Sequence, residues 1–158
     1  MSKAILDQYR DYVRRRGFRA FQADNVKEAA GHYSLDAFLN FFVERLGGHT
    51  FVEVPSGQGR TDILILYKSW KYVIETKVFT DNYSFQQGKH QLAAYLTTEG
   101  LSEGYYVVFS NLHTEEDERY IAEEIAGKRI HTYIIRIRFT QPSRLPVPRT
   151  ADEPEAYL

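Results

Sequence analysis

Hydrophobic residues recur at the spacing of an α-helix in three stretches of the chain. Positions three and four apart in such a stretch lie on one face, which can then pack on the rest of the protein. Glycines follow the first two stretches, and glycine is common just after a helix end. The pattern therefore predicts helices over residues 2–16, 24–46 and 85–96.

Five further stretches are short, rich in β-branched and aromatic residues, and either alternating or continuously apolar, as strands are. They are residues 50–54, 62–67, 72–79, 105–110 and 131–139. Residues 68–71 lie between the second and third of them and predict a turn, which makes this pair a β-hairpin. The nearly continuous apolar run at 105–110 predicts a buried parallel strand, reached through the preceding helix in a βαβ crossover.

Together these elements predict an α/β fold, a three-layer sandwich in which helices flank both faces of a mixed central sheet. A further, acidic helix is predicted over residues 113–126, opened by Thr114 and closed by Gly127. The chain of 158 residues has the size of one domain, to which we assign residues 1–140. Residues 141–158 hold four of the five prolines and predict an extended tail.

The composition excludes several classes of function. The chain has no cysteine, which excludes disulfides, thiolate nucleophiles and zinc sites with cysteine ligands. No apolar run approaches the roughly 20 residues that cross a bilayer, and residues 1–16 are too charged for a signal peptide. We therefore expect a cytoplasmic protein without a membrane contact. The formal net charge of −1 gives no general attraction to nucleic acid, so such binding requires a local basic patch or a metal ion.

Three charged residues interrupt the predicted hairpin. Asp62 opens its first strand, and Glu75 and Lys77 lie within its second strand. Because side chains alternate between the two faces of a strand, Glu75 and Lys77 point to the same face. Asp62 approaches Glu75 if the strands pair in a suitable register, which the sequence permits without deciding.

Charges within an apolar strand are costly to bury unless they are paired or bind a metal ion. Two converging carboxylates repel each other, and Mg²⁺ relieves the repulsion, since it is commonly held by one or two carboxylates and several waters. The ion polarises a phosphoryl oxygen, and the ammonium of Lys77 can stabilise the charge that develops there. The alternative is an exposed hairpin on which Glu75 and Lys77 form a weak surface pair. The spacing alone leaves both interpretations open.

The ordered segments GRTDILI, YVIETKV, GKHQLAAYL and GYYVVFS resemble the core of the PD-(D/E)XK nuclease superfamily. Asp62 followed by Glu75-Thr76-Lys77 matches its D…(D/E)-x-K signature, although Thr61 rather than a proline precedes the aspartate. Over residues 28–109 the chain resembles a nuclease-like domain found at the C-terminal end of prokaryotic proteins whose upstream part is a P-loop ATPase.

The resemblance implies a restriction-endonuclease-like fold with Mg²⁺ or Mn²⁺ as cofactor. Asp62 and Glu75 are then metal ligands, and Glu28 is a further candidate ligand. In the family an accessory acid precedes a histidine by one helical turn, as Glu28 precedes His32. Glu44, near the far end of the same predicted helix, is the weaker candidate.

A Q-x-x-x-Y motif faces the metal site in this superfamily, and Gln91 and Tyr95 reproduce it. The resemblance thus implies that Gln91 holds a water or the lysine and that Tyr95 contacts the strand that is cut. It gives a catalytic set of Asp62, Glu75, Lys77, Gln91 and Tyr95. On residue type alone, a buried hydrogen-bond network for Gln91 and a core position for Tyr95 are equally good interpretations.

Arg60, Lys89 and His90 place positive charge near the predicted site and are candidate contacts to nucleic acid. The expected activity is metal-dependent hydrolysis of phosphodiester bonds, with DNA as the substrate and an ATPase as a partner. The alternative is a domain with the same fold that binds nucleic acid or a partner without cutting, as part of a larger ATPase. An intact set of Asp62, Glu75 and Lys77 favours the enzyme.

Overall fold

The computed structural model describes residues 3–15, 21, 28–56, 59–111 and 120–137, with the backbone alone at 3, 28, 29, 54–56 and 59–61. These residues form three helices and six strands. The helices are α1 (Lys3–Arg15), α2 (Glu28–Arg45) and α3 (Asn82–Thr98). The strands are β1 (His49–Ser56), β2 (Gly59–Tyr67), β3 (Trp70–Val78), β4 (Glu103–Ser110), β5 (Tyr120–Ile125) and β6 (Lys128–Arg136).

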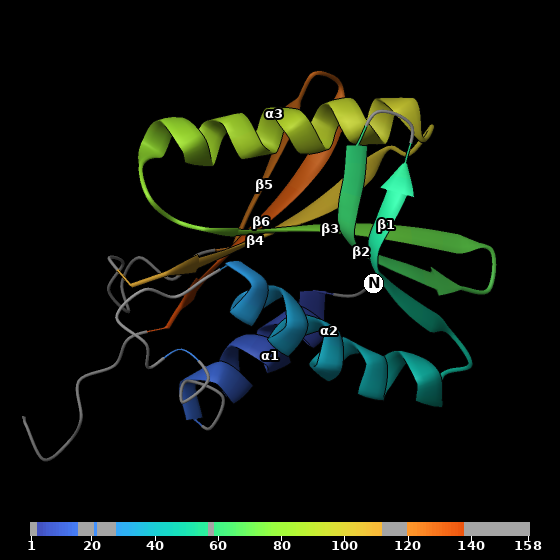
Figure 1. Cartoon of the computed structure of the whole chain (residues 1–158). Coiled ribbons are helices and arrows are strands. Elements are labelled where there is room, and N and C mark those ends of the chain that lie inside the picture. The colour runs from blue at the N-terminus through green and yellow to red at the C-terminus, as the bar shows by residue number, and fades with distance from the viewer. Residues whose placement is uncertain (1–2, 16–20, 22–27, 57–58, 112–119, 138–158) are drawn as a thin grey trace, which may run out of the picture.

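The strands form one mixed sheet in the order β1-β2-β3-β4-β6-β5. Neighbours among β1, β2 and β3 are antiparallel, β3, β4 and β6 run parallel, and β5 returns antiparallel along β6. Helix α3 covers one face of the sheet, and α1 and α2 cover the other (Figure 1). This confirms the predicted three-layer α/β sandwich. The parallel pair β3 and β4, joined through α3, confirms the predicted crossover.

The sheet separates two hydrophobic cores. The core on the side of α1 and α2 includes Leu6, Tyr9, Leu35, Leu39, Ile63, Ile74, Val107 and Phe109. The core beneath α3 includes Phe85, Leu92, Leu96, Leu64, Val73, Tyr106 and Val108. Successive residues of one strand belong to opposite cores, so the central strands are buried on both faces, as the continuous hydrophobic run of β4 predicts.

The predicted hairpin is present with longer strands and a shorter turn. Its turn is the two residues Lys68 and Ser69, because Tyr67 pairs with Trp70. Lys68 has a φ of 54°, the left-handed value that two-residue hairpin turns need. The predicted turn of residues 68–71 is therefore too long. Likewise β1 extends to Ser56 and β2 begins at Gly59, beyond the predicted strand ranges of 50–54 and 62–67.

A strand, β5, occupies residues 120–125, where the sequence predicts part of a helix; residues 112–119 lie outside the described part. Ala126 and Gly127 have φ values of 49° and 74°, as a type I′ turn requires at its two central positions. That turn joins β5 to β6 as a hairpin, and the tertiary pairing overrides the helix preference of alanine and glutamate.

Side-chain contacts hold β5 on both faces of the sheet. On the α3 face Glu123 forms an ion pair with Lys89. On the other face the Tyr120 hydroxyl lies 2.5 Å from Nδ1 of His131. Nε2 of the same imidazole lies 2.9 Å from a carboxylate oxygen of Glu103 on β4. These contacts tie the edge strand to its neighbours in the sheet and to the helix above it.

Helix α3 begins three residues earlier than predicted because Asp81 caps it. The Asp81 carboxylate accepts hydrogen bonds from the backbone N–H of Ser84 at 2.8 Å and from the Ser84 hydroxyl at 3.0 Å. The backbone hydrogen bond is the main reason that the pKa of Asp81 lies below its ordinary value, since it stabilises the charged form. The polar residues before the predicted helix are thus its cap and first turn.

Replacing Asp81 with alanine should lower the melting temperature by a few degrees, because α3 loses its cap. Serine, a good capping residue, should retain most of the stability. The charged cap stabilises the fold above the ordinary Asp pKa, and this contribution is lost as the pH falls through the lower folded-state pKa. Thermal unfolding by circular dichroism from neutral to acid pH measures both effects. An alanine variant with the parent's pH dependence would contradict this role.

No described helix is long and apolar enough to cross a membrane. The predicted tail and the end of the assigned domain fall in residues 138–158, outside the described residues, so the domain boundary stays a prediction.

Candidate metal and active site

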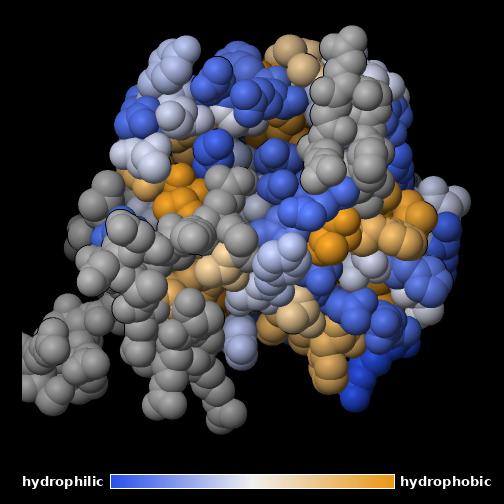
Figure 2. All heavy atoms as spheres, viewed as in Figure 1, coloured by the Kyte–Doolittle hydropathy of each residue, from blue (hydrophilic) through white to orange (hydrophobic). Residues whose placement is uncertain are grey.

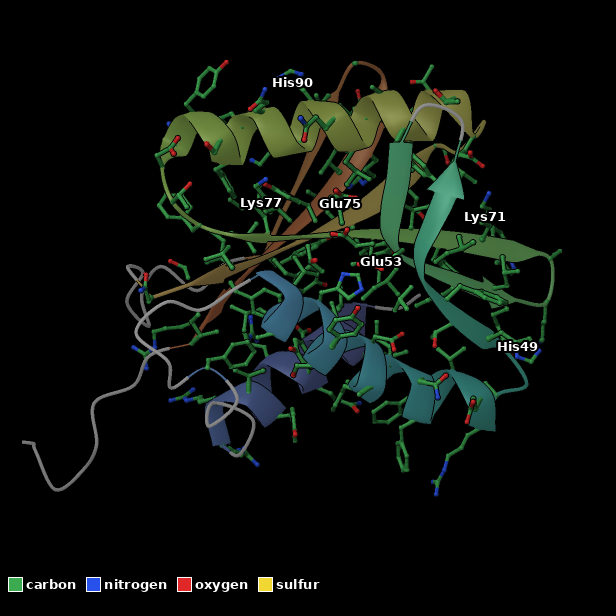
Figure 3. The ribbon with its side chains drawn as sticks, in the orientation of Figure 1. His49, Glu53, Lys71, Glu75, Lys77 and His90 are labelled. Atoms are coloured by element: carbon green, nitrogen blue, oxygen red, sulfur yellow. The ribbon has the colours of Figure 1, made fainter. Side chains whose placement is uncertain are left out.

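Glu75 and Lys77 lie on the β3 face that α3 covers. Val73 belongs to the core beneath α3, whereas its neighbour Ile74 belongs to the core of α1 and α2. Alternation along the strand then places Glu75 and Lys77 on the side of Val73. Figure 3 shows both side chains in the layer between α3 and the sheet. The carboxylate and the ammonium are therefore presented to the same side of the sheet.

Asp62 lies at the fork where β2 and β3 stop pairing. The last paired residues are Ile63 and Ile74, so Asp62 and Glu75 hold the next positions on the two strands. Oδ2 of Asp62 accepts hydrogen bonds from the backbone N–H and the hydroxyl of Thr76, at 2.7 and 2.8 Å. The Asp62 carboxylate replaces the missing ladder bond and is fixed between the strands.

His32 of α2 approaches the same carboxylate from the opposite side of the sheet. Its Nδ1 lies 3.9 Å from Oδ1 of Asp62. His32 is only 5% exposed, and its Nε2 has no hydrogen-bond partner among the described residues. Buried polar atoms usually have a partner, and none of the described residues supplies one to this nitrogen. His32 is a neighbour of the site to which the sequence pattern assigns no role of its own, although its spacing of one helical turn from Glu28 was the signal for one.

Gln91 and Tyr95 lie on the flank of α3 that faces β3. The opposite flank carries Lys89, which pairs with β5. The C-terminal end of α3 is held to β3 by Lys71, whose ammonium donates to Glu99 at 2.6 Å. Gln91 is exposed and Tyr95 is half-buried against the core beneath α3. This flank is the one that the Q-x-x-x-Y interpretation needs, and contact of either residue with the site stays a prediction.

Lys89 and His90, two of the candidate contacts to nucleic acid, do not lie beside the candidate site. Lys89 is only 3% exposed, and its ammonium pairs with Glu123 and lies 4.4 Å from the centre of the Phe85 ring. Lys89 thus lies on the buried face of α3, and its predicted contact with nucleic acid stays a prediction. His90 is exposed, but it stands on the outer side of α3, away from Glu75 (Figure 3).

The side chains of Glu28 and Arg60 lie outside the described residues, so their predicted roles stay predictions. Glu28 begins α2, and His32, one turn later, approaches Asp62. The start of α2 is thus the end that lies near the site. Glu44 is exposed and lies about 18 Å farther along the helix axis than His32. This distance agrees with ranking Glu28 above Glu44.

The donor atoms at the fork suit a hard divalent cation. Among the described residues no three His, Asp or Glu side chains surround a common point. Mg²⁺ does not need such a cage, because one or two carboxylates and several waters are enough. Asp62 keeps Oδ1 free of the Thr76 hydrogen bonds, and Glu75 holds the adjoining strand position. Carboxylates at these two positions are the ligand type that Mg²⁺ and Mn²⁺ take, and their binding of one shared ion stays a prediction.

The fold and this fork define an α/β sandwich with two carboxylates and a lysine on one hairpin. The chain belongs to the family DUF8371, a domain of unknown function, whose model matches residues 1–113. No curated protein matches the chain. It is similar to a solved structure described as "Structure of a Type III CRISPR defence DNA nuclease activated by cyclic oligoadenylate", with 13% identity and a TM-score of 0.43. The match covers 70% of this chain and 20% of that one, so the chain spans about a fifth of that protein.

Proposed function

We propose that this protein is a metal-dependent nuclease that hydrolyses phosphodiester bonds of nucleic acid, with DNA as the substrate. The observation that carries the proposal is the fork between β2 and β3. Hydrogen bonds from Thr76 fix the carboxylate of Asp62 there. Glu75 holds the facing strand position, and Lys77 lies two residues further on the same face.

The ligands we propose for Mg²⁺ or Mn²⁺ are Oδ1 of Asp62 and the carboxylate of Glu75, with Glu28 as a further candidate. When bound, the ion polarises a phosphoryl oxygen and lowers the pKa of a bound water. The protein's own contribution is to fix its ligands in advance. Asp62 cannot turn away without breaking two hydrogen bonds to Thr76, and such pre-positioning is what an efficient site requires.

Lys77 is the residue that we propose acts on the reacting phosphate. Hydrolysis adds water across one P–O bond, leaving a phosphate on one strand end and a hydroxyl on the other. Negative charge builds up on the phosphoryl oxygens as the water attacks, and a positioned ammonium stabilises it. The resemblance assigns Gln91 to the attacking water or the lysine and Tyr95 to the strand that is cut.

The direct test is cleavage of labelled linear and supercoiled DNA by the purified chain. Mg²⁺ or Mn²⁺ should support cleavage and a chelator should stop it. Ca²⁺ should bind yet support little turnover, because its larger and looser shell positions water poorly. Calorimetry should show that Asp62→Ala loses Mn²⁺ binding, whereas Asp11→Ala, at an exposed acid on α1, retains it.

Glu75→Gln provides a second ligand variant in case Asp62→Ala fails to fold. Cleavage that persists in the chelator, or Mn²⁺ binding that survives both ligand variants, would contradict the proposal. Metal binding without any cleavage would instead support the alternative of a silent domain that binds nucleic acid or a partner. The ATPase partner rests on the resemblance alone and stays a prediction.

A further inference from the structure

The sheet face beneath α3 extends past the helix over β1 and β2. Helix α3 packs mainly on β3, β4 and β6. On the uncovered part of this face, Phe51 is 44% exposed and Leu66 is 38% exposed, and His49 is also exposed. On the opposite face, α2 covers β1, where the Thr50 hydroxyl donates to Asn40 at 2.8 Å. Among the helices that the structure describes, only α2 covers these two strands, and it does so from one side.

The exposed residues form one continuous surface, which we call the β1–β2 platform: His49, Phe51 and Leu66. Phe51 lies opposite Leu64, and His49 lies opposite Leu66. Cross-strand partners share a face, and Leu64 belongs to the core beneath α3. The rings of His49 and Phe51 lie 6.4 Å apart between centroids. Figure 2 shows hydrophobic residues at the right of the view, where Figure 1 places β1, β2 and β3, and others at the left and the bottom.

The platform is continuous with the candidate site. Along β2, Asp62 is two residues from Leu64, the register partner of Phe51. Two residues of a strand span about 6.7 Å, so a phosphate at the fork places the neighbouring nucleotide beside the platform. Lys71 borders the platform from β3, although its charge is shared with Glu99. Figure 3 shows Lys71 and His49 toward the end of the sheet that lies away from Lys77.

We infer that the β1–β2 platform binds unpaired bases, so that the substrate enters the site as single-stranded nucleic acid. Phe51 is an aromatic residue with 44% of its surface exposed, and base–aromatic stacking is independent of sequence because every base has a π-face. Paired bases in a duplex hide these faces within their own stack. The apolar residues therefore select a flexible strand, while Lys71 and His49 suit its phosphates. This inference rests on the proposed function, because it takes the fork as the place of the scissile phosphate.

The test measures binding without cleavage, in a chelator, so it does not depend on activity. Fluorescence anisotropy compares a fluorescein-labelled oligothymidylate with the same strand annealed to its complement, at one low salt concentration. Phe51→Ala should weaken binding of the single strand by about 5- to 150-fold, the range that loss of one stacked base gives. Phe51→Tyr should retain binding. Tyr83→Ala, at a residue that is 77% exposed on α3, is the matched control and should change nothing.

Equal single-strand binding by Phe51→Ala and Tyr83→Ala would overturn the inference, as would wild-type binding that is no weaker for the duplex. A second copy of the chain could occupy the platform instead, and sedimentation of the wild type measures such self-association. Self-association that Phe51→Ala abolishes, with no loss of oligonucleotide binding, would also overturn it. A chain that cuts duplex DNA with Mg²⁺ but binds no single strand loses this inference and keeps the proposed function. A chain that binds single strands as expected but never cuts DNA keeps this inference and loses the proposed function.

Discussion

Lys77→Ala should lower the rate of DNA cleavage by about 10²–10³-fold, the usual cost of removing one donor that stabilises the transition state. Mn²⁺ binding should stay near the wild-type level, because Asp62 and Glu75 hold the ion. The fold should also persist, since Lys77 lies at the end of β3, past the last residue that pairs with β2. Single-turnover cleavage at saturating DNA measures the rate, and calorimetry measures metal binding.

The matched control for Lys77 is Lys128→Ala, which removes a lysine of similar exposure at the start of β6. It should cut DNA at the wild-type rate. If Lys77→Ala also cuts at that rate, the lysine has no catalytic role, and the activity belongs to another group or to a contaminant. If Lys77→Ala loses metal binding as well, the residue acts on the fold or on the ligands rather than on the phosphate.

Gly31→Ala should destabilise the protein by about 1–3 kcal/mol, the usual cost of overpacking a core. A Cβ at this position lies 2.3 Å from a ring carbon of Phe109. That ring is fully buried and stacks on Phe21, with centroids 5.5 Å apart, so it has little room to move. The higher helix propensity of alanine, worth up to about 1 kcal/mol, offsets part of the loss.

A double variant separates this steric effect from a general weakening of α2. Phe109→Leu shortens the obstructing side chain and should itself destabilise the fold. Combined with Gly31→Ala it should cost less than the sum of the two single changes, because the smaller side chain makes room for the methyl group. Denaturant unfolding is best followed by circular dichroism, since the single tryptophan, Trp70, is 64% exposed. Strictly additive effects would contradict the contact.

The sequence predicts the layers of this protein well because the hydrophobic residues of its central elements follow clear helix or strand patterns. The apolar run of β4 and the helical spacing in α2 each allow one interpretation, and packing agrees with it. The β5 segment does not, because its Ala and Glu residues favour a helix that the folded chain does not form. Its structure is decided by the turn at Ala126 and Gly127 and by pairing with β6, which only the folded chain supplies.

The candidate site, too, can be predicted from the local sequence pattern only in part. Alternation alone puts Glu75 and Lys77 on one face. The partner of Asp62 depends on the turn: with a turn over 68–71, Asp62 would stand opposite Lys77. The two-residue turn at Lys68 and Ser69 brings it opposite Glu75 instead. The approach of His32 depends on how α2 crosses the sheet, which no local pattern contains.

The hairpin of β2 and β3 also has a consequence for the order in which the chain folds. Its paired residues are close in sequence, whereas the parallel pairing of β3 with β4 joins residues such as Ile74 and Tyr105 across the whole of α3. Closing a short loop costs less entropy than closing a long one, and local contacts favour fast folding. The fork at Asp62 is therefore encoded in one short continuous segment. The fork can persist while the sequence of distant parts of the chain changes, provided that the turn keeps its two residues.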